Sequence, residues 1–273
     1  MKPIYNINGL VHWQQSEITS RERMQAKFAE DVQGWLRGVN AAWRMDRVEA
    51  PIMIPRSLIN ANYTNDDLWV FHQHDAHEPE LVARPETTPS TYAWMVDQLR
   101  GHNQIKLPWC VWQSGKSFRA EQDQVLKHMR LKEFYQMEFQ CAFSADTAMD
   151  YHVACVEPVR KMLGSAVGLP TRIVESDRLP SYSLSTMDIE VLIPEPEVLN
   201  SPFDRGDHYP YAPVNSSGRW MEICSISKRT DFPIKNKYQT KNKEWKETDI
   251  LVLEIAIGLD RCVNARGIAD SLV

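Results

Sequence analysis

One pattern in the sequence decides the fold: Phe118-Arg119-Ala120-Glu121, a polar stretch, and then Arg130-Leu131-Lys132-Glu133-Phe134-Tyr135-Gln136-Met137-Glu138. It predicts two antiparallel strands joined by a loop. Arg119 and Arg130 can bind phosphates through paired hydrogen bonds. Phe134 offers a flat face on which a purine can stack, and Glu121 can accept a hydrogen bond from an exocyclic amino group. The pattern therefore indicates a site for a nucleoside triphosphate.

The spacing Arg-x-Glu, loop, Arg-x-x-x-Phe-x-x-x-Glu resembles motif 2 of the class II aminoacyl-tRNA synthetases. The alternative is a hairpin with surface ion pairs, each worth roughly 0–1 kcal/mol. The resemblance implies an α+β fold, in which an antiparallel sheet is flanked by helices. It also implies a ligase reaction with ATP and Mg²⁺ as cofactors.

A long amphipathic helix is predicted ahead of this pattern. Thr19 and Glu22 have the spacing of a capping box and predict its start. Its apolar stripe consists of Met24, Phe28, Val32, Trp35, Val39 and Trp43. An extended, proline-punctuated segment follows at residues 47–55. Together they resemble motif 1, which forms the dimer interface in that family, so a homodimer is expected.

Residues 250–261 are predicted to form a buried strand that turns at Gly258 into a helix. This segment resembles motif 3, whose glycine lets the backbone approach the nucleotide and whose arginine, here Arg261, contacts the γ-phosphate. By the same resemblance, Arg119 contacts the α-phosphate and Arg130 an outer phosphate. The residues expected to bind ATP are Arg119, Glu121, Arg130, Phe134 and Arg261, with Arg119 and Arg261 in the catalytic role.

The run Arg84-Pro85-Glu86-Thr87 resembles a segment of glycyl-tRNA synthetases whose glutamate belongs to the amino-acid pocket. An α-ammonium group needs a fixed anion in a partly dry site. Glu86 is also a favourable carboxylate at the start of a predicted helix, and the two roles are compatible. The residues that the resemblance assigns to the amino-acid pocket are Glu86, Glu138, Arg229 and Glu254.

A predicted strand at residues 219–232 resembles the Glu-x-x-Gly-x-x-x-Arg-Thr-Asp segment of glycyl enzymes and the Glu-Ile-x-Ser-x-Ser segment of seryl enzymes. Mg²⁺ bridges substrate phosphates with one or two protein carboxylates. The expected metal ligands are Glu222, Ser225 and Glu254. Arg229 is expected to face the substrate carboxylate or a phosphate. The alternative is that Glu222 and Arg229 point to solvent from an ordinary strand.

Other segments carry simpler predictions. Strands are predicted at residues 68–71, 107–113 and 188–194, and the last resembles the strand beside the substrate pocket of class II domains. Residues 148–164 are predicted to form a helix that ends at Gly164. Its inward-facing residues are expected to be Val153, Val156, Val159 and Leu163.

Two polar segments leave alternatives open. His72, His74 and His77 are of the residue type that binds zinc, but the neighbouring Asp, Glu and Pro favour an exposed loop. Residues 228–247 carry seven positive and three negative side chains. This segment is either a contact surface for an RNA acceptor end or a flexible loop.

The bulk composition is that of a globular protein, with 43% hydrophobic and 25% charged residues among 273. The net charge of -5 gives no global attraction for nucleic acid, and no DNA partner is expected. The sequence has no signal-like or membrane-spanning apolar run, so no membrane partner is expected. Scattered cysteines in an odd number predict reduced thiols and a cytoplasmic location: Cys110, Cys141, Cys155, Cys224 and Cys262.

The resemblance covers roughly residues 20–273 and is strongest to the glycyl branch. We expect a single catalytic domain, residues 1–273, without a C-terminal anticodon-binding domain. The expected activity is ATP-dependent activation of a small amino acid as its adenylate, followed by transfer to a tRNA acceptor end. The alternatives are transfer to a carrier protein or another acceptor, and a non-catalytic role as a subunit or regulator. Glu254-Ile255-Ala256 stands where the glycyl pattern has Glu-Pro-Ser, which leaves the amino acid open.

Overall fold

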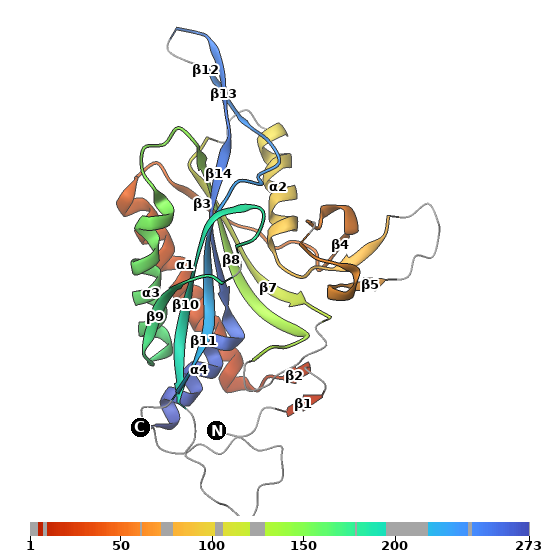
Figure 1. Cartoon of the computed structure of the whole chain (residues 1–273), viewed down its shortest axis with the longest axis vertical. Coiled ribbons are helices and arrows are strands. Elements are labelled where there is room, and N and C mark those ends of the chain that lie inside the picture. Colours follow the sequence, from red (N-terminus) through yellow and green to blue (C-terminus); the bar gives the residue numbers. More distant parts are fainter. Residues whose placement is uncertain are drawn as a thin grey trace, which may run out of the picture.

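The computed structural model describes residues 5–7, 10–60, 62–71, 79–101, 106–120, 129–177, 179–194, 218–239 and 242–272. A seven-stranded sheet is its largest element (Figure 1). In spatial order its strands are β3 (Arg44–Arg47), β7 (Trp109–Phe118), β8 (Glu133–Ser144), β14 (Ile250–Gly258), β11 (Gly218–Arg229), β10 (Ser183–Pro194) and β9 (Thr171–Glu175). Only the β3–β7 pair is parallel among these neighbours. The predicted α+β fold and the predicted β7–β8 hairpin are confirmed.

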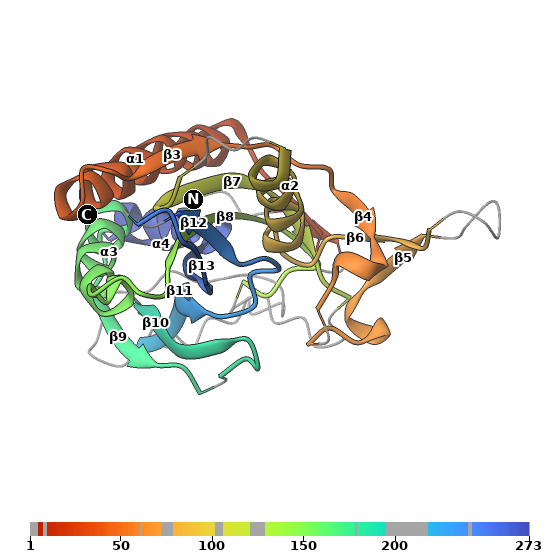
Figure 2. The same ribbon diagram turned by 90° about the horizontal axis from the view of Figure 1, so that it is seen from above.

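Helices cover the two faces of the sheet unequally (Figure 2). One face packs against α1 (Gln15–Val39), α3 (Tyr151–Val167) and α4 (Leu259–Ser271), and the other against α2 (Thr88–Gly101). The alternation of side chains along a strand divides the core accordingly. On β7, Cys110 and Trp112 belong to the first cluster, and Trp109 and Val111 lie in the second, beside α2. Much of this second face remains open for a site.

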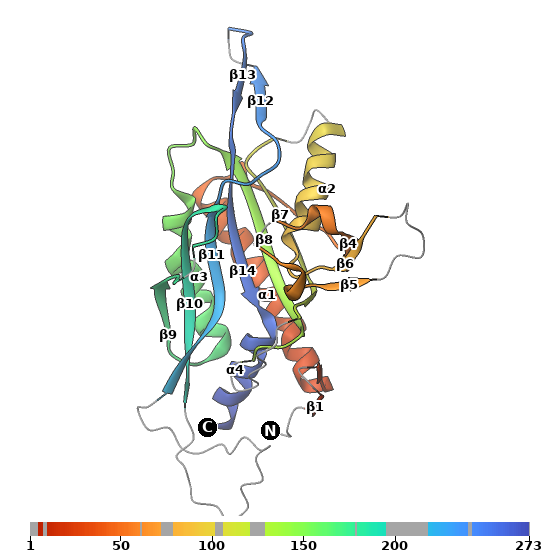
Figure 3. The same ribbon diagram turned by 45° about the vertical axis from the view of Figure 1, so that its right-hand side comes forward.

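Three smaller sheets surround the main one. They are β1 (Tyr5–Ile7) with β2 (Leu10–His12), β6 (Leu81–Ala83) between β4 (Met53–Pro55) and β5 (Trp69–Phe71), and β12 (Asn236–Gln239) with β13 (Trp245–Thr248). Short 3-10 helices, η1 (Arg56–Leu58) and η2 (Asn65–Asp67), connect β4 to β5. The β12–β13 hairpin projects beyond the body of the molecule (Figure 3). Part of the predicted basic segment is therefore a pair of strands rather than a loop.

The boundaries predicted for α1 are wrong at both ends. The helix begins at Gln15 after the N-cap Gln14, so Thr19 lies inside it and caps nothing. It ends at Val39, where the Asn40 N–H donates to the Leu36 carbonyl. Trp43, predicted on the same stripe, lies beyond the helix and packs edge-on against Tyr151. Burial of the indole, rather than the helical period, explains its place in the apolar pattern.

The predicted helix of residues 148–164 is α3, and its C-terminal boundary is wrong. The helix continues to Val167 and ends at Gly168, whose φ of 73° is the left-handed conformation that favours glycine. Gly164 lies within the helix, where a Cβ atom would come within 3.0 Å of Thr171. Val156, Val159 and Leu163 are buried as predicted, but Val153 is 71% exposed.

Other predictions concern the cysteines, the histidine cluster and membrane spans. All five cysteines are buried and unpaired, which confirms the prediction of reduced thiols. The predicted strands at residues 68–71, 107–113 and 188–194 correspond to β5, β7 and β10. His72, His74 and His77 fall outside the described residues. None of the described helices combines the length and hydropathy that crossing a membrane requires.

Candidate active site

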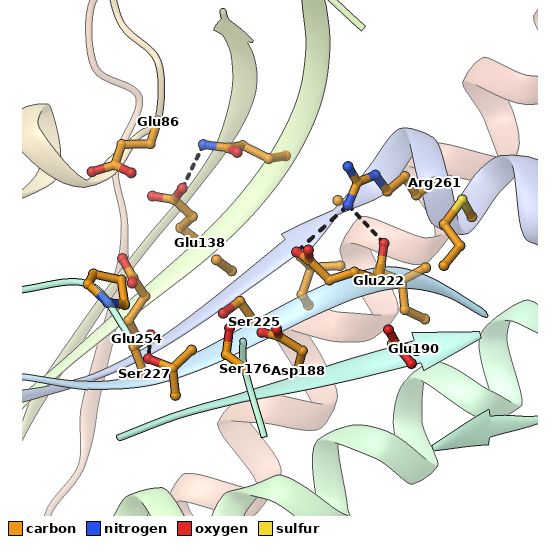
Figure 4. A pocket seen from close by; sticks show the side chains of 18 of the residues that line it. Glu86, Glu138, Ser176, Asp188, Glu190, Glu222, Ser225, Ser227, Glu254 and Arg261 are labelled. Atoms are coloured by element: carbon orange, nitrogen blue, oxygen red, sulfur yellow. Dashed lines mark hydrogen bonds and ion pairs between the residues drawn. The ribbon is translucent and has the colours of Figure 1, made fainter. Parts of the chain in front are cut away.

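A cavity of about 920 Å³ lies on the open face of the sheet. Its floor is built by cross-strand register: Glu138 on β8 pairs with Ala256 on β14, Ala256 with Ser225 on β11, and Ser225 with Asp188 on β10. Because partners in register point to the same face, one line of side chains crosses four strands. Figure 4 shows the carboxylates Glu86, Glu138 and Glu254 toward one end and Glu222 with Arg261 toward the other.

The first end of the cavity is acidic and dry. Glu86, Glu138 and Glu254 are each buried, although they come from three separate segments of the chain. Glu86 Oε2 accepts a hydrogen bond of 2.7 Å from the Tyr63 hydroxyl, whereas its Oε1 is buried with no hydrogen-bond partner in the described part of the chain. Burial raises the pKa of Glu86, and the Arg229 guanidinium opposes this shift. The free oxygen leaves an acceptor available to a ligand.

Glu138 is held by uncharged donors. Its Oε2 accepts from Thr87 Oγ1 at 2.5 Å and lies 2.9 Å from Thr88 Oγ1, and its Oε1 accepts from Gln136 Nε2 at 2.6 Å. Burial, followed by repulsion from Glu254 and Glu86, raises the pKa of Glu138 to about 7. The carboxyl group is therefore poised between its neutral and ionised forms near neutral pH.

Arg229 is the cation of the acidic end, and its guanidinium is only 1% exposed. It donates two hydrogen bonds to Asp231, of 3.0 and 2.7 Å, and one to Glu254 of 2.8 Å. The Tyr182 ring lies against it, with its centroid 3.8 Å from the guanidinium carbon. Burial acts to lower the pKa of Arg229, but Glu254 and then Tyr92 and Asp231 raise it overall. The alternative that Arg229 points to solvent is wrong.

Arg119, Arg130 and Phe134, three of the residues expected to bind ATP, line the cavity. Arg119 Nε donates to the Pro85 carbonyl at 3.2 Å, and its guanidinium carbon is 5.3 Å from the Phe134 ring centroid. Glu121 falls outside the described residues. The β7–β8 hairpin thus places an arginine and an aromatic ring beside the acidic end.

The second end is formed by the junction of β14 and α4. Arg261, in the first turn of α4, donates to the Glu222 carbonyl at 2.9 Å, and its Nη1 is 3.7 Å from Glu222 Oε1 (Figure 4). Glu222 is about half exposed. Gly258 precedes the helix, and a Cβ there would lie 3.5 Å from Arg261 Cδ, in ordinary contact. A side chain at residue 258 would therefore fit beside Arg261 without a steric clash.

The donor set near Glu222 fits a Mg²⁺ ion. Ser225 follows on the same strand, and Asp188 pairs with Ser225 on β10. Asp188 is 9% exposed, and its Oδ1 is buried with no hydrogen-bond partner in the described part of the chain. Burial, and next the Glu222 charge, raise the pKa of Asp188. An unsatisfied carboxylate oxygen beside a second carboxylate and a hydroxyl is a suitable arrangement for a hard cation that also binds phosphates.

Glu254 occupies a different place from the other expected metal ligands. Its Oε1 accepts from Arg229, Gln140 and Thr88 at the acidic end. Glu222 and Ser225 lie further along β11 (Figure 4). Within the described residues, no three His, Cys, Asp or Glu side chains form a metal-binding group. Glu254 therefore lies at the acidic end, apart from Glu222 and Ser225.

Several residues in or beside the cavity were not singled out as site residues from the sequence. Tyr63, Gln136 and Tyr182 line the cavity, and Thr87, Thr88 and Asp231 bind the charged side chains of its acidic end. Thr87 and Thr88 directly follow Glu86, and Asp231 closely follows Arg229, so proximity to residues already singled out was a usable signal. Tyr63 and Tyr182 lie in segments with no distinctive pattern, and only the fold brings them to the cavity.

The sequence from residue 69 to residue 266 matches the family described as "tRNA synthetase class II core domain (G, H, P, S and T)". Among curated proteins, it is 29% identical over 198 residues to the glycine–tRNA ligase of Mycoplasma capricolum subsp. capricolum, covering 68% of this chain and 38% of that protein. The glycine–tRNA ligase of Mycoplasmopsis synoviae is 27% identical over 203 residues, covering 70% of this chain and 40% of that protein. The chain thus spans about two fifths of these relatives.

Solved structures provide a match over nearly the whole chain. Prolyl-tRNA synthetase from Cryptosporidium parvum, complexed with halofuginone and AMPPNP, superposes with a TM-score of 0.68 at 13% identity. The match covers 97% of this chain and 48% of that one. The same enzyme complexed with L-proline and AMP gives a TM-score of 0.66, also at 13% identity, over 97% of this chain and 49% of that one. This likeness shows the fold.

Proposed function

Because this chain belongs to the class II tRNA synthetase core-domain family, we propose that it activates a small amino acid with ATP to form an aminoacyl adenylate. The observation that carries the proposal is the acidic end of the cavity. Three buried carboxylates meet there, and one of them, Glu86, keeps an unpaired oxygen next to the arginine and aromatic ring of the β7–β8 hairpin. An ammonium group supplies the positive charge and the donors that such a pocket lacks.

The amino acid is proposed to bind with its ammonium among Glu86, Glu138 and Glu254. Its carboxylate then points toward Arg119, which is fixed from behind by the Pro85 carbonyl. The adenine stacks on Phe134, and Glu121 accepts a hydrogen bond from the base. Arg130 and Arg261 bind the outer phosphates.

The reaction is an attack of the amino-acid carboxylate on the α-phosphorus of ATP, with cleavage of the bond to pyrophosphate. Arg119 neutralises charge on the α-phosphate as the new bond forms, and Arg261 does the same on the leaving group. Glu222 and Ser225 would hold Mg²⁺, which would supply positive charge beside the outer phosphates. Catalysis consists of positioning and charge neutralisation, and no side chain forms a covalent intermediate.

The proposed acceptor of the aminoacyl group is the end of a tRNA. The β12–β13 hairpin supports this, because it projects from the body and carries basic side chains and a 73% exposed Trp245. Lys235 and Lys237 there pair with Asp249 and Glu247, so part of the positive charge is already neutralised. A single-stranded RNA end can stack on an exposed indole.

A homodimer in the cytoplasm is part of the same proposal. The β4–β6–β5 sheet presents exposed apolar side chains on its two outer strands, which are Met53 on β4 and Trp69, Val70 and Phe71 on β5. An apolar patch of this kind is suited to a protein interface. The unpaired cysteines are compatible with a reducing compartment.

The deciding experiment is amino-acid-dependent exchange of labelled pyrophosphate into ATP, measured with each of the twenty amino acids. Exchange with one small amino acid, lost in Arg119→Ala, is the expected result. Arg160→Ala is the matched control, because Arg160 is a surface arginine that pairs with Glu157 on α3. Exchange with no amino acid would refute independent activation and favour the role of a subunit or regulator.

A further inference from the structure

The acidic end of the cavity contains a hydroxyl group with three polar neighbours. Thr88 Oγ1 lies 2.9 Å from Glu138 Oε2 and 2.7 Å from Glu254 Oε1. Gln140 Nε2 donates to the same oxygen at 2.8 Å. All four residues are buried. Thr88 therefore connects a carboxyl group on β8 with another on β14.

The number of hydrogens available around Thr88 bears on the ionisation of Glu138 and Glu254. A hydroxyl has one hydrogen to donate and two lone pairs. One lone pair of Thr88 receives the Gln140 hydrogen, and its own hydrogen serves one of the two glutamates. The other glutamate oxygen faces the hydroxyl at hydrogen-bond distance with no hydrogen from Thr88. All of these contacts are satisfied when one carboxyl group carries its own proton and donates it to Thr88.

The proton belongs on Glu138. Glu254 Oε1 accepts from the Arg229 guanidinium, and a charged donor favours the ionised carboxylate. Glu138 has only uncharged donors, and burial raises its pKa to about 7. The ionisable groups that act on Glu138 are Glu86 before α2, Glu254 on β14, Arg84 after β6 and Tyr182 before β10.

We propose that Thr88 is a positioning residue: its hydroxyl, together with a proton on Glu138, holds Glu138 and Glu254 at the spacing of one ammonium group, which displaces that proton on binding. The proposal rests on the amino-acid site proposed above. On binding, the O–H bond of Glu138 breaks and the proton leaves to solvent. The carboxylate that remains accepts a hydrogen bond from the ammonium, and no other bond changes.

This arrangement has two consequences for the free and the bound protein. The free pocket avoids a further buried charge beside Glu86 and Glu254, which would be costly. A ligand must bring a positive charge to replace the proton, so an amine in its ammonium form is selected over a neutral molecule of the same shape. Amino-acid binding becomes tighter as the pH rises toward the pKa of Glu138, because Glu138 is protonated in a smaller fraction of the molecules.

Infrared spectroscopy tests the shared proton without any substrate. At pH 6 we expect a component of the carboxylic-acid carbonyl band in the wild type that Glu138→Gln removes, beside the component of Asp260 that it leaves. The matched control is Glu133→Gln, because Glu133 is a partly exposed residue of the same strand that pairs with Lys116. The control variant should keep the band. A wild-type spectrum equal to that of Glu138→Gln would overturn the shared proton.

Pyrophosphate exchange with glycine and alanine tests the positioning role. In the wild type, KM for the amino acid should fall about tenfold per pH unit below pH 7, and Glu138→Gln should lose this dependence. Thr88→Val should raise KM about tenfold with kcat little changed, and Thr88→Ser should restore KM. Thr91→Val removes another buried threonine hydroxyl of α2, bonded to the Thr87 carbonyl, and should change neither.

These outcomes separate the inference from the function on which it rests. Exchange that proceeds with a pH-independent KM, or that is equally impaired in Thr88→Val and Thr91→Val, would refute the positioning role and leave activation standing. Absence of exchange with every amino acid would refute activation. In that case the infrared band still decides whether Glu138 carries the proton.

Discussion

Arg229 and Glu254 form a buried ion pair in which Nη1 lies 2.8 Å from Oε1. Their side chains are 1% and 8% exposed, and the two residues face each other from neighbouring strands of the sheet. Asp231 occupies the other edge of the same guanidinium through two hydrogen bonds. The pair therefore links β11 to β14 and lies at the acidic end of the cavity.

Removing the Arg229 charge should destabilise the fold. Arg229→Met leaves Glu254 buried without its cation, and breaking one partner of a buried pair costs roughly 3–5 kcal/mol. Urea unfolding followed by tryptophan fluorescence measures the loss. Arg160→Ala, which breaks an exposed pair with Glu157, should cost about 0–1 kcal/mol. Equal losses in the two variants would contradict the structural role of Arg229.

Stability should fall as the pH rises toward neutrality because of Asp260. This carboxylate accepts the Tyr135 N–H at 2.8 Å and lies 3.5 Å from Arg21 Nη1. Burial raises its pKa from 3.8 to about 7, against the opposing effects of Tyr135 and Arg21. The folded state thus favours the neutral acid, and this contribution is fully present below about pH 4 and lost as the pH rises through about 7.

Thermal unfolding between pH 4 and pH 8 measures this dependence. Asp260→Asn cannot ionise, so its unfolding midpoint should fall less steeply with pH than that of the wild type. Asp270→Asn is the control, because Asp270 is an exposed residue of the same helix paired with Arg266. A slope unchanged in Asp260→Asn would show that this carboxylate does not titrate in the range.

Truncation of Phe134 should weaken ATP binding selectively. Stacking of a base on an aromatic side chain is worth roughly 1–3 kcal/mol, so Phe134→Ala should raise KM for ATP by about 5- to 150-fold. KM for the amino acid should change little, because none of the contacts given above joins Phe134 to Glu86, Glu138 or Glu254. Phe134→Tyr should keep most of the affinity. A change confined to the amino-acid KM would contradict the assigned role.

Ala256 is the position from which amino-acid specificity can be changed. It lies in register between Glu138 and Ser225, so a side chain added there enters the cavity. Ala256→Ser adds a hydroxyl and reduces the space for a substrate methyl group. The ratio of kcat/KM for glycine to that for alanine should rise about tenfold in pyrophosphate exchange. An unchanged ratio would place the substrate side chain elsewhere.

The β12–β13 hairpin should matter for transfer but not for activation. Trp245→Ala and Lys246→Ala should lower tRNA aminoacylation several-fold and reduce its salt dependence, while pyrophosphate exchange stays within twofold of the wild type. Lys27→Ala is the matched control for a lost surface charge, because Lys27 is an exposed residue of α1 paired with Asp31. Equal losses in exchange and aminoacylation would indicate a structural effect of the hairpin.

The sequence by itself determined the fold class and the order of the main elements. The β7–β8 hairpin and the strand that turns at Gly258 into α4 were predictable because strand alternation and turn residues are local properties. Helix ends were less predictable. Gly164 was predicted to end the helix, but it lies within α3, where its missing side chain leaves room for Thr171. The helix ends at Gly168 instead.

Only the tertiary structure decided how the site is held together. Glu86, Glu138 and Glu254 were identified individually, but their common contact through Thr87, Thr88 and Gln140 depends on the register of β8 and β14 and on the start of α2. The proposed proton on Glu138 and the proposed place of Glu254 in the amino-acid pocket rest on distances between residues far apart in the chain. A sequence pattern specifies which side chains are present, whereas their ionisation depends on burial and neighbours that exist only after folding.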